Sequence, residues 1–102
     1  MPRTVAWAFA ARQDLLSALQ YLVDQSALDS AQRLLDQLEA AAGSLSELSE
    51  RGRIVPELGP PRRELIVEGY RLVYRVRQDR VQILRVIHGR QDFLATWRRR
   101  PR

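Results

Sequence analysis

The spacing of apolar residues changes once along this 102-residue chain, and that change constrains the fold more than any other feature. From Leu15 to Leu48 the apolar residues recur every three or four positions, which is typical of one face of a helix. From Leu65 to Ile87 they alternate with other residues, as in a strand with one buried face. The segment between them, Ser49 to Pro61, holds two glycines and three prolines and is predicted to be a loop.

The helical spacing predicts two helices joined by a short link. The first runs from about Ala10 to Gln25, and Ser26 or Asp29 caps the second. Gly43 lies in the second apolar stripe, where an interior glycine costs about 1 kcal/mol relative to alanine. Because the link is short, we expect an antiparallel hairpin whose apolar stripes need a sheet to cover them.

The alternating segment predicts three strands joined by turns at Gly69 and at Gln78 to Arg80, which form an antiparallel meander. The N-terminal segment from Arg3 to Phe9 alternates in the same way and predicts one more strand. The order is strand, helix, helix, strand, strand, strand. This order predicts an α+β fold in which a helical hairpin packs on a mostly antiparallel four-stranded sheet.

The C-terminal end changes character after Gly89. The apolar residues there are spaced as in one or two helical turns, namely Phe93, Leu94 and Trp97. We expect a single domain over residues 1–97, followed by a basic mobile tail over residues 98–102.

Several classes of protein are disfavoured by what the sequence lacks. No apolar run approaches the roughly 18 residues of a membrane span, and the N-terminus has no signal-peptide pattern. The absence of cysteine excludes disulfides and thiolate metal sites, and is typical of a cytoplasmic protein. There is no glycine-rich phosphate loop, nucleophile elbow or metal-ligand cluster, so no cofactor and no metal are expected.

The chain carries a formal net charge of +5, and all 17 of its basic residues are arginine. Arginine keeps its charge and offers a planar fork of donors to phosphate or carboxylate. A nucleic acid or an acidic protein is therefore an expected partner. Codon bias remains an alternative explanation for the choice of arginine over lysine, because asparagine is absent as well.

Regular alternation would decide which charged residues share a surface. In the strand beginning at Tyr70, one side carries Arg71, Val73, Arg75 and Arg77, and the other carries Leu72, Tyr74 and Val76. In the last strand, Leu84 and Val86 go with His88, whereas Arg85 goes with Val81, Ile83 and Ile87. One face of the sheet is thus predicted to present Arg71, Arg75 and His88, with Glu57 and Arg63 near its margin.

Such a group of residues has the chemistry to hold a phosphodiester. Glu57 would act as base and His88 as acid, while arginine would stabilise the developing charge. The alternative is a solvated sheet face with structural ion pairs, which is the commoner arrangement for charges on an exposed strand. A lone histidine is also more often packed or capping than catalytic.

Four segments, in their order and spacing, resemble the RelE/ParE toxin superfamily: GRIVPEL (52–58), RREL (62–65), GYRLVYRV (69–76) and VQILRVIHGR (81–90). Trp7, the Asp14–Leu15 start of the first helix and the two-helix hairpin match as well, so the resemblance covers nearly the whole chain. It implies the toxin of a type II toxin–antitoxin pair. Such a toxin is held inactive by a cognate antitoxin whose disordered tail wraps it, and the pair commonly represses its own promoter.

The resemblance leaves two targets open. ParE-type members inhibit DNA gyrase, whereas RelE-type members and the YoeB group cut messenger RNA on the ribosome. A YoeB-like interpretation gives the base role to Glu57, phosphate binding to Arg71 and the acid role to His88, with Arg63 in support. However, Gly89 stands where that group has a tyrosine, and the chain lacks the lysines of RelE-like members. Because GRIVPEL and VIHGR look most like ParE, gyrase is the expected target, and an inactive or otherwise directed member is a third possibility.

The resemblance also implies two binding surfaces. The expected contacts with gyrase lie on the sheet face and the basic C-terminal segment, namely Arg53, Arg75, Arg90, Trp97 and Arg98. The antitoxin would place an amphipathic helix in a groove formed by exposed apolar residues of the hairpin, namely Leu15, Leu19, Leu22, Leu34 and Leu38. A partly disordered acidic antitoxin with a DNA-binding N-terminus suits the +5 charge and would carry the toxin to operator DNA.

Overall fold

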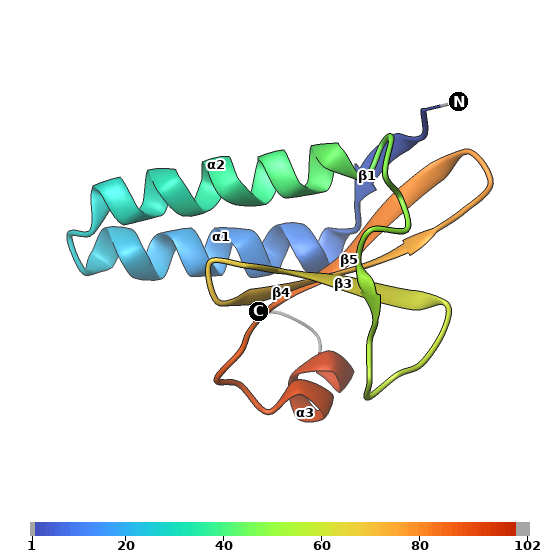
Figure 1. Cartoon of the computed structure of the whole chain (residues 1–102). Helices are drawn as coiled ribbons and strands as arrows, with labels where there is room; N and C mark the ends of the chain where they lie inside the picture. The colour runs from blue at the N-terminus through green and yellow to red at the C-terminus, as the bar shows by residue number, and fades with distance from the viewer. Residues whose placement is uncertain (1, 100–102) are drawn as a thin grey trace.

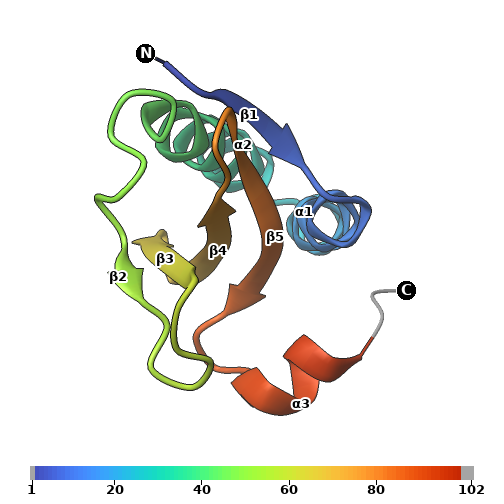
Figure 2. The same cartoon turned by 90° about the vertical axis from the view of Figure 1, so that its right-hand side faces the viewer.

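Three layers make up the fold: a helical hairpin, a five-stranded sheet, and a short C-terminal helix on the opposite side of the sheet (Figures 1 and 2). The computed structural model describes residues 2–99. The helices are α1 (Phe9–Asp24), α2 (Leu28–Ser44) and α3 (Phe93–Arg98). The strands are β1 (Thr4–Trp7), β2 (Arg53–Ile54), β3 (Arg62–Val67), β4 (Tyr70–Val76) and β5 (Arg80–His88). None of the described helices is long and apolar enough to cross a bilayer.

The sheet has the order β1-β5-β4-β3-β2, and only the β1–β5 pair is parallel. The α+β class and the antiparallel meander are confirmed. The expected count of four strands is wrong, because β2 pairs with β3 inside the segment predicted to be a loop. Two residues are too few for alternation to reveal a strand. Gly52 permits this pairing, because a Cβ there would lie 2.6 Å from the Glu64 carbonyl oxygen and the Tyr74 hydroxyl.

The hairpin forms as predicted, with different ends. Phe9, which is 68% exposed, begins α1 and does not end the first strand. The expected caps of α2 are wrong: its N-cap is Ala27, without a side-chain hydrogen bond. Ser26 instead takes a left-handed conformation (φ 57°) in the link, and Asp29 lies within the first turn. Gly43 is accommodated inside α2, where a Cβ would meet no atom within 4 Å.

The sheet buries apolar residues on both faces. On the hairpin side the strands contribute Leu72, Tyr74, Val81, Ile83 and Val86. The helices contribute Ala11, Leu34, Leu38 and Ala42, and Leu45, the residue that follows α2, completes the cluster. On the α3 side a smaller cluster joins Val55, Val73, Ile87 and Phe93. The predicted orientation of Leu72 and Tyr74 toward the helices is therefore confirmed. The second cluster fixes α3 against the sheet.

A bulge in β5 changes which residues share a face. Val73 pairs with Arg85 but the next residue, Tyr74, pairs with Ile83, so Leu84 is the extra residue. Val81 and Ile83 consequently face the hairpin, whereas Ile87 faces α3. The prediction that these residues lie on one side is wrong, because the bulge reverses the alternation beyond Leu84.

Candidate functional site

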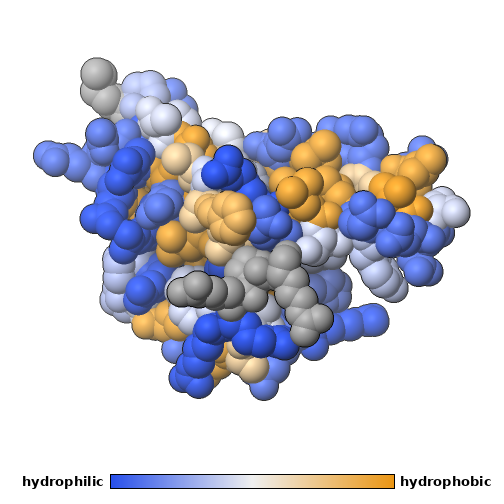
Figure 3. Space-filling view, turned by 180° about the vertical axis from the view of Figure 1, so that it is seen from behind, coloured by the Kyte–Doolittle hydropathy of each residue, from blue (hydrophilic) through white to orange (hydrophobic). Residues whose placement is uncertain are grey.

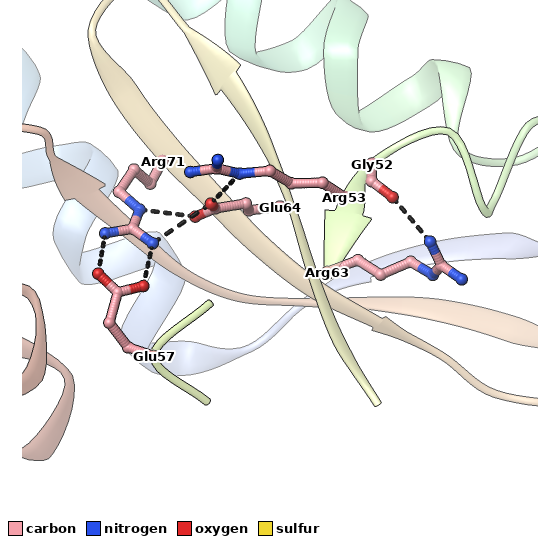
Figure 4. A network of polar contacts seen from close by, with 6 residues as sticks. All are labelled: Gly52, Arg53, Glu57, Arg63, Glu64 and Arg71. Atoms are coloured by element: carbon pink, nitrogen blue, oxygen red, sulfur yellow. Dashed lines mark hydrogen bonds and ion pairs between the residues drawn. The ribbon is translucent and has the colours of Figure 1, made fainter. Parts of the chain in front are cut away.

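Four charged residues form a closed network on the α3 side of the sheet (Figure 4). Arg71 in β4 donates from both terminal nitrogens to Glu57, at 2.9 and 2.6 Å. Its Nε donates to Oε1 of Glu64 in β3 at 2.6 Å, and Arg53 in β2 donates to Oε2 of the same carboxylate at 2.7 Å. Two carboxylates thus neutralise two guanidinium groups.

Glu64 is the residue around which this network is built. Its side chain is 0% exposed, and a buried carboxylate without partners would be strongly destabilising. Charge-assisted bonds from Arg53 and Arg71 meet its oxygens from two neighbouring strands. Glu64 was not among the predicted site residues, because its place in an alternating strand gave no sign that its face would be covered.

Electrostatics bind Glu57 and Arg71 tightly to each other. The hydrogen bond from Arg71 lowers the pKa of Glu57 from 4.5 to about 2, although partial burial works against this shift. The same bond raises the pKa of Arg71 above its ordinary value. The Arg71 guanidinium also lies 3.9 Å from the centroid of the Phe93 ring, a cation–π contact that ties the network to α3.

His88 lies on the opposite face of the sheet from Arg71. It pairs with Tyr70, and the two rings meet edge to face at 4.9 Å between centroids. The Nδ1 of His88 accepts the backbone N–H of Arg90 at 3.0 Å. The prediction that Arg71 and His88 share a face is wrong, because the bulge at Leu84 turns His88 toward the hairpin.

A cleft opens on the hairpin side next to His88. It has a volume of about 340 Å³ and is bounded by Tyr21, Tyr70 and the Arg33–Glu68 ion pair. Burial, with a smaller effect of Tyr21, raises the pKa of Tyr70. His88 therefore belongs to an aromatic cleft and not to the carboxylate network.

The other predicted catalytic residue, Arg63, also points away from the network (Figure 4). Its terminal nitrogen donates to the carbonyl of Gly52 at 2.8 Å and, more weakly, to that of Glu50 at 3.4 Å. Arg63 therefore holds the segment before β2. Of the predicted set, the structure brings together Glu57 and Arg71 only.

The predicted target-binding residues are dispersed. Arg53 ends the network with its side chain 61% exposed, and Arg75 hydrogen-bonds to Gln82 at 3.3 Å. Trp97 is half-buried and stacks on Phe93. Arg90 and Arg98 are exposed. Of the predicted tail, residue 98 ends α3, while residues 100–102 lie outside the described residues.

The predicted antitoxin-binding leucines are not an exposed surface. Leu34 and Leu38 are 4% and 0% exposed, and Leu15, Leu19 and Leu22 pack against the same core. The expectation of exposure is wrong for Leu34 and Leu38, because the sheet covers the stripe that periodicity identified. Other residues of the hairpin are exposed, namely Phe9, Leu16, Tyr21, Val23 and Leu28. Figure 3 shows separate hydrophobic groups among hydrophilic residues over the hairpin.

A second buried ion pair was also missed. Arg85 in β5 bonds through two nitrogens to Asp14 in α1, at 2.7 and 3.0 Å. Its third nitrogen donates to the carbonyls of Thr96, Trp97 and Arg99 at the end of α3. One arginine therefore joins α1, β5 and α3. Adjacent apolar residues at 83–84 and 86–87 break the alternation of the last strand. This break was the sequence signal that could have revealed the bulge and, with it, the burial of Arg85.

The hairpin, the five-stranded sheet with one parallel edge strand, and the covered ion network define a small α+β protein of the RelE/ParE kind. The family model described as ParE toxin of type II toxin-antitoxin system, parDE, matches residues 5–93. The chain is 36% identical over 85 residues to Toxin RelE2 of Caulobacter vibrioides, covering 83% of this chain and 93% of that protein. Its fold matches that of a solved chromosomal ParDE TA system from P. aeruginosa with a TM-score of 0.72, at 22% identity over 84% of this chain and 95% of that one.

The chain belongs to the ParE toxin family of type II toxin–antitoxin systems, within the RelE/ParE superfamily. Membership in this family implies a cognate antitoxin as partner.

Proposed function

We propose that this toxin acts by binding DNA gyrase and not by cutting RNA. The observation that carries the proposal is the closed Glu57–Arg71–Glu64 network, together with the position of His88 on the other face. A ribonuclease of the YoeB type would need Glu57, Arg71 and His88 around one phosphodiester. A toxin that acts by binding needs only a stable surface, which this network provides.

The protonation behaviour of Glu57 argues against catalysis. A general base works best with a pKa near the operating pH, whereas the pKa of Glu57 is about 2. Both its oxygens already accept hydrogen bonds from Arg71. Four of the five N–H groups of Arg71 donate to Glu57 and Glu64, so a single N–H is left and Arg71 cannot grip a phosphate through a pair of donors.

The surface that we propose for gyrase is α3 and the turn before it. Arg90 and Arg98 are exposed there, and Trp97 forms part of the apolar cluster beneath. Two contacts hold this helix against the sheet: Arg71 lies over the ring of Phe93, and Arg85 donates to carbonyls at the end of α3. The proposed role of the ion networks is thus to present α3 in a fixed orientation.

The antitoxin, we propose, docks on the outer side of α1. Phe9, Leu16 and Val23 follow one another at intervals of seven residues, and their exposed fractions are 68%, 58% and 45%. This spacing matches the apolar seam of a partner helix. An acidic, partly disordered antitoxin suits the net charge of +5, and its own DNA-binding part would carry the pair to operator DNA. We place the toxin in the cytoplasm, where gyrase acts.

A supercoiling assay with purified toxin and gyrase of the native host tests the proposal. The wild type should block supercoiling at micromolar concentration, and the Arg90→Gln/Arg98→Gln variant should need a several-fold higher concentration. The matched control is Arg12→Gln/Arg33→Gln, which removes the same charge from the exposed hairpin and should inhibit as the wild type does. Gyrase that is unaffected by the wild type at this concentration would refute the proposal.

A ribosome-dependent messenger RNA endoribonuclease is the second candidate. The relative named Toxin RelE2 favours it. His88→Gln separates the two candidates, because His88 is the acid in the nuclease interpretation and lies outside the carboxylate network. Under our proposal this variant keeps its toxicity and its inhibition of gyrase. Loss of toxicity in a folded H88Q protein, with messenger RNA cleavage by the wild type, would establish the nuclease.

A further inference from the structure

Four arginines gather on the α3 side of the sheet, at the end where β4 turns into β5. Arg62 and Arg75 are direct cross-strand partners, and Arg75 lies opposite Gln82. Arg77 and Arg80 flank the turn, with the backbone N–H of Arg77 donating to the Arg80 carbonyl at 2.7 Å. Alternation along each strand turns these four side chains to one face. We call Arg62, Arg75, Arg77 and Arg80 the arginine patch. The β4–β5 turn projects beyond the rest of the sheet (Figure 1).

The arginine patch differs from the neighbouring network in having no acidic partners. Within residues 2–99, no guanidinium of the patch forms an ion pair, not even with Asp79 in the intervening turn. Arg75 bonds only to the amide of Gln82. Arg62 lies 5.8 Å from the centre of the Trp97 ring, and its buried Nε has no hydrogen-bond partner. Both outer arginines, at positions 77 and 80, are exposed.

This arrangement is electrostatically unfavourable in the free protein. Directly opposed side chains in an antiparallel pair have Cβ atoms about 5 Å apart, and like charges at that distance destabilise the pair. Arg77, the residue after β4, follows Arg75 on the same face at about 7 Å. Four positive charges at these spacings are relieved by an extended anion that meets several of them at once.

The chemistry of the patch selects among anions. Guanidinium forks match phosphate oxygens in pairs, and the patch is an open surface at a protruding turn. Single-stranded nucleic acid is usually held by exposed aromatic rings on which bases stack. Here Trp97 is covered by Arg62 and Phe93, and the exposed aromatic residues, Phe9 and Tyr21, lie on α1. We infer that the arginine patch binds the phosphate backbone of double-stranded DNA without reading its sequence.

The salt dependence of DNA binding measures how many phosphates the arginine patch contacts. Each phosphate neutralised on duplex DNA contributes about −0.9 to the slope of log K against log salt, so four contacts give about −3.6. Each arginine removed from the patch should reduce the slope by about 1. Arg77→Gln/Arg80→Gln should therefore bring it to about −1.8. Both arginines are exposed, so this variant should remain folded.

The experiment is fluorescence anisotropy of a short labelled DNA duplex titrated with the full-length toxin over a salt series, without gyrase. The variant R77Q/R80Q is compared with R12Q/R33Q, which also removes two charges from the formal +5 but on the hairpin. Binding at low salt with the slopes given above, and a wild-type slope for R12Q/R33Q, supports the inference.

Three outcomes would overturn it. One is absence of duplex binding at the lowest salt. The second is that R77Q/R80Q and R12Q/R33Q weaken duplex binding equally, because binding would then depend on the net charge of the protein and not on the arginine patch. The third is equally tight binding of a single strand or of polyglutamate, which would assign the patch to another kind of anion. Because the assay contains no gyrase, a negative result for duplex binding does not bear on the proposal that the toxin inhibits gyrase, which the supercoiling assay tests separately.

Discussion

Replacing Arg85 by methionine should destabilise this toxin more than any other single change to a charged residue outside the Glu64 network. In the native protein the side chains of Arg85 and Asp14 are 7% and 10% exposed. Methionine retains much of the apolar volume but removes every donor. The Asp14 carboxylate then keeps only the backbone N–H of Val86, at 2.9 Å, and three carbonyls at the end of α3 lose their partner.

The magnitude follows from leaving one charge of a buried pair without its partner. Such changes cost about 3–5 kcal/mol, against a total stability of about 5–15 kcal/mol for a domain of this kind. Each kcal/mol lowers the melting temperature of a small domain by about 4–8 °C, so the decrease for Arg85→Met should exceed about 10 °C.

The assay is urea unfolding of the wild type, Arg85→Met, and the double variant Asp14→Asn/Arg85→Met. Asparagine at position 14 carries no charge, yet its amide oxygen still accepts the N–H of Val86. The double variant should therefore be more stable than Arg85→Met alone, with an interaction energy of about 1–3 kcal/mol. A loss below about 1 kcal/mol for Arg85→Met, or a double variant no more stable than the single one, would refute this account of the pair.

Three further predictions concern other parts of the molecule. The pKa of Glu57 is lowered on folding from 4.5 to about 2, so its contribution to stability is complete above pH 4.5 and is lost as the pH falls toward 2. Wild-type urea midpoints should therefore fall more steeply than those of Glu57→Gln over this range. Gly52→Ala should cost about 1–3 kcal/mol in the same assay, because its Cβ would meet the Tyr74 hydroxyl at 2.6 Å, and a stability equal to the wild type would contradict that clash. Leu16→Glu should weaken antitoxin binding in calorimetry while changing stability by less than about 0.5 kcal/mol, whereas Leu38→Ala should lose about 2–5 kcal/mol in stability.

The spacing of apolar residues predicted those helices and strands that bury a whole apolar stripe against the opposite layer of the fold. The hairpin and the strands β3 to β5 each bury a stripe against the other layer, and that stripe is visible in the sequence. β2 was missed because a pairing of two residues leaves no period to detect. The α+β class could thus be predicted, whereas the strand count could not.

The site was harder to predict, because it depends on one extra residue. With Leu84 as a bulge, His88 and Arg71 separate to opposite faces, and a group that looked catalytic in sequence is divided. Glu64 and Arg85 were not predicted to be buried, because alternation gives no sign that α3 and the segment with Val55 pack on this face of the sheet. The contact of Glu57 with Arg71 was the one pairing that sequence reasoning anticipated and the structure contains.

The short outer strands of the sheet have a consequence for a toxin released from its antitoxin. An exposed strand edge is a template for pairing with another chain, and long edges lead to aggregation. Here the outer strands β1 and β2 span four and two residues, and where β1 ends, the Asp14 carboxylate occupies the backbone N–H of Val86 on β5. β1 and β2 themselves therefore offer little edge to a neighbouring strand, so that contacts made there are left to side chains.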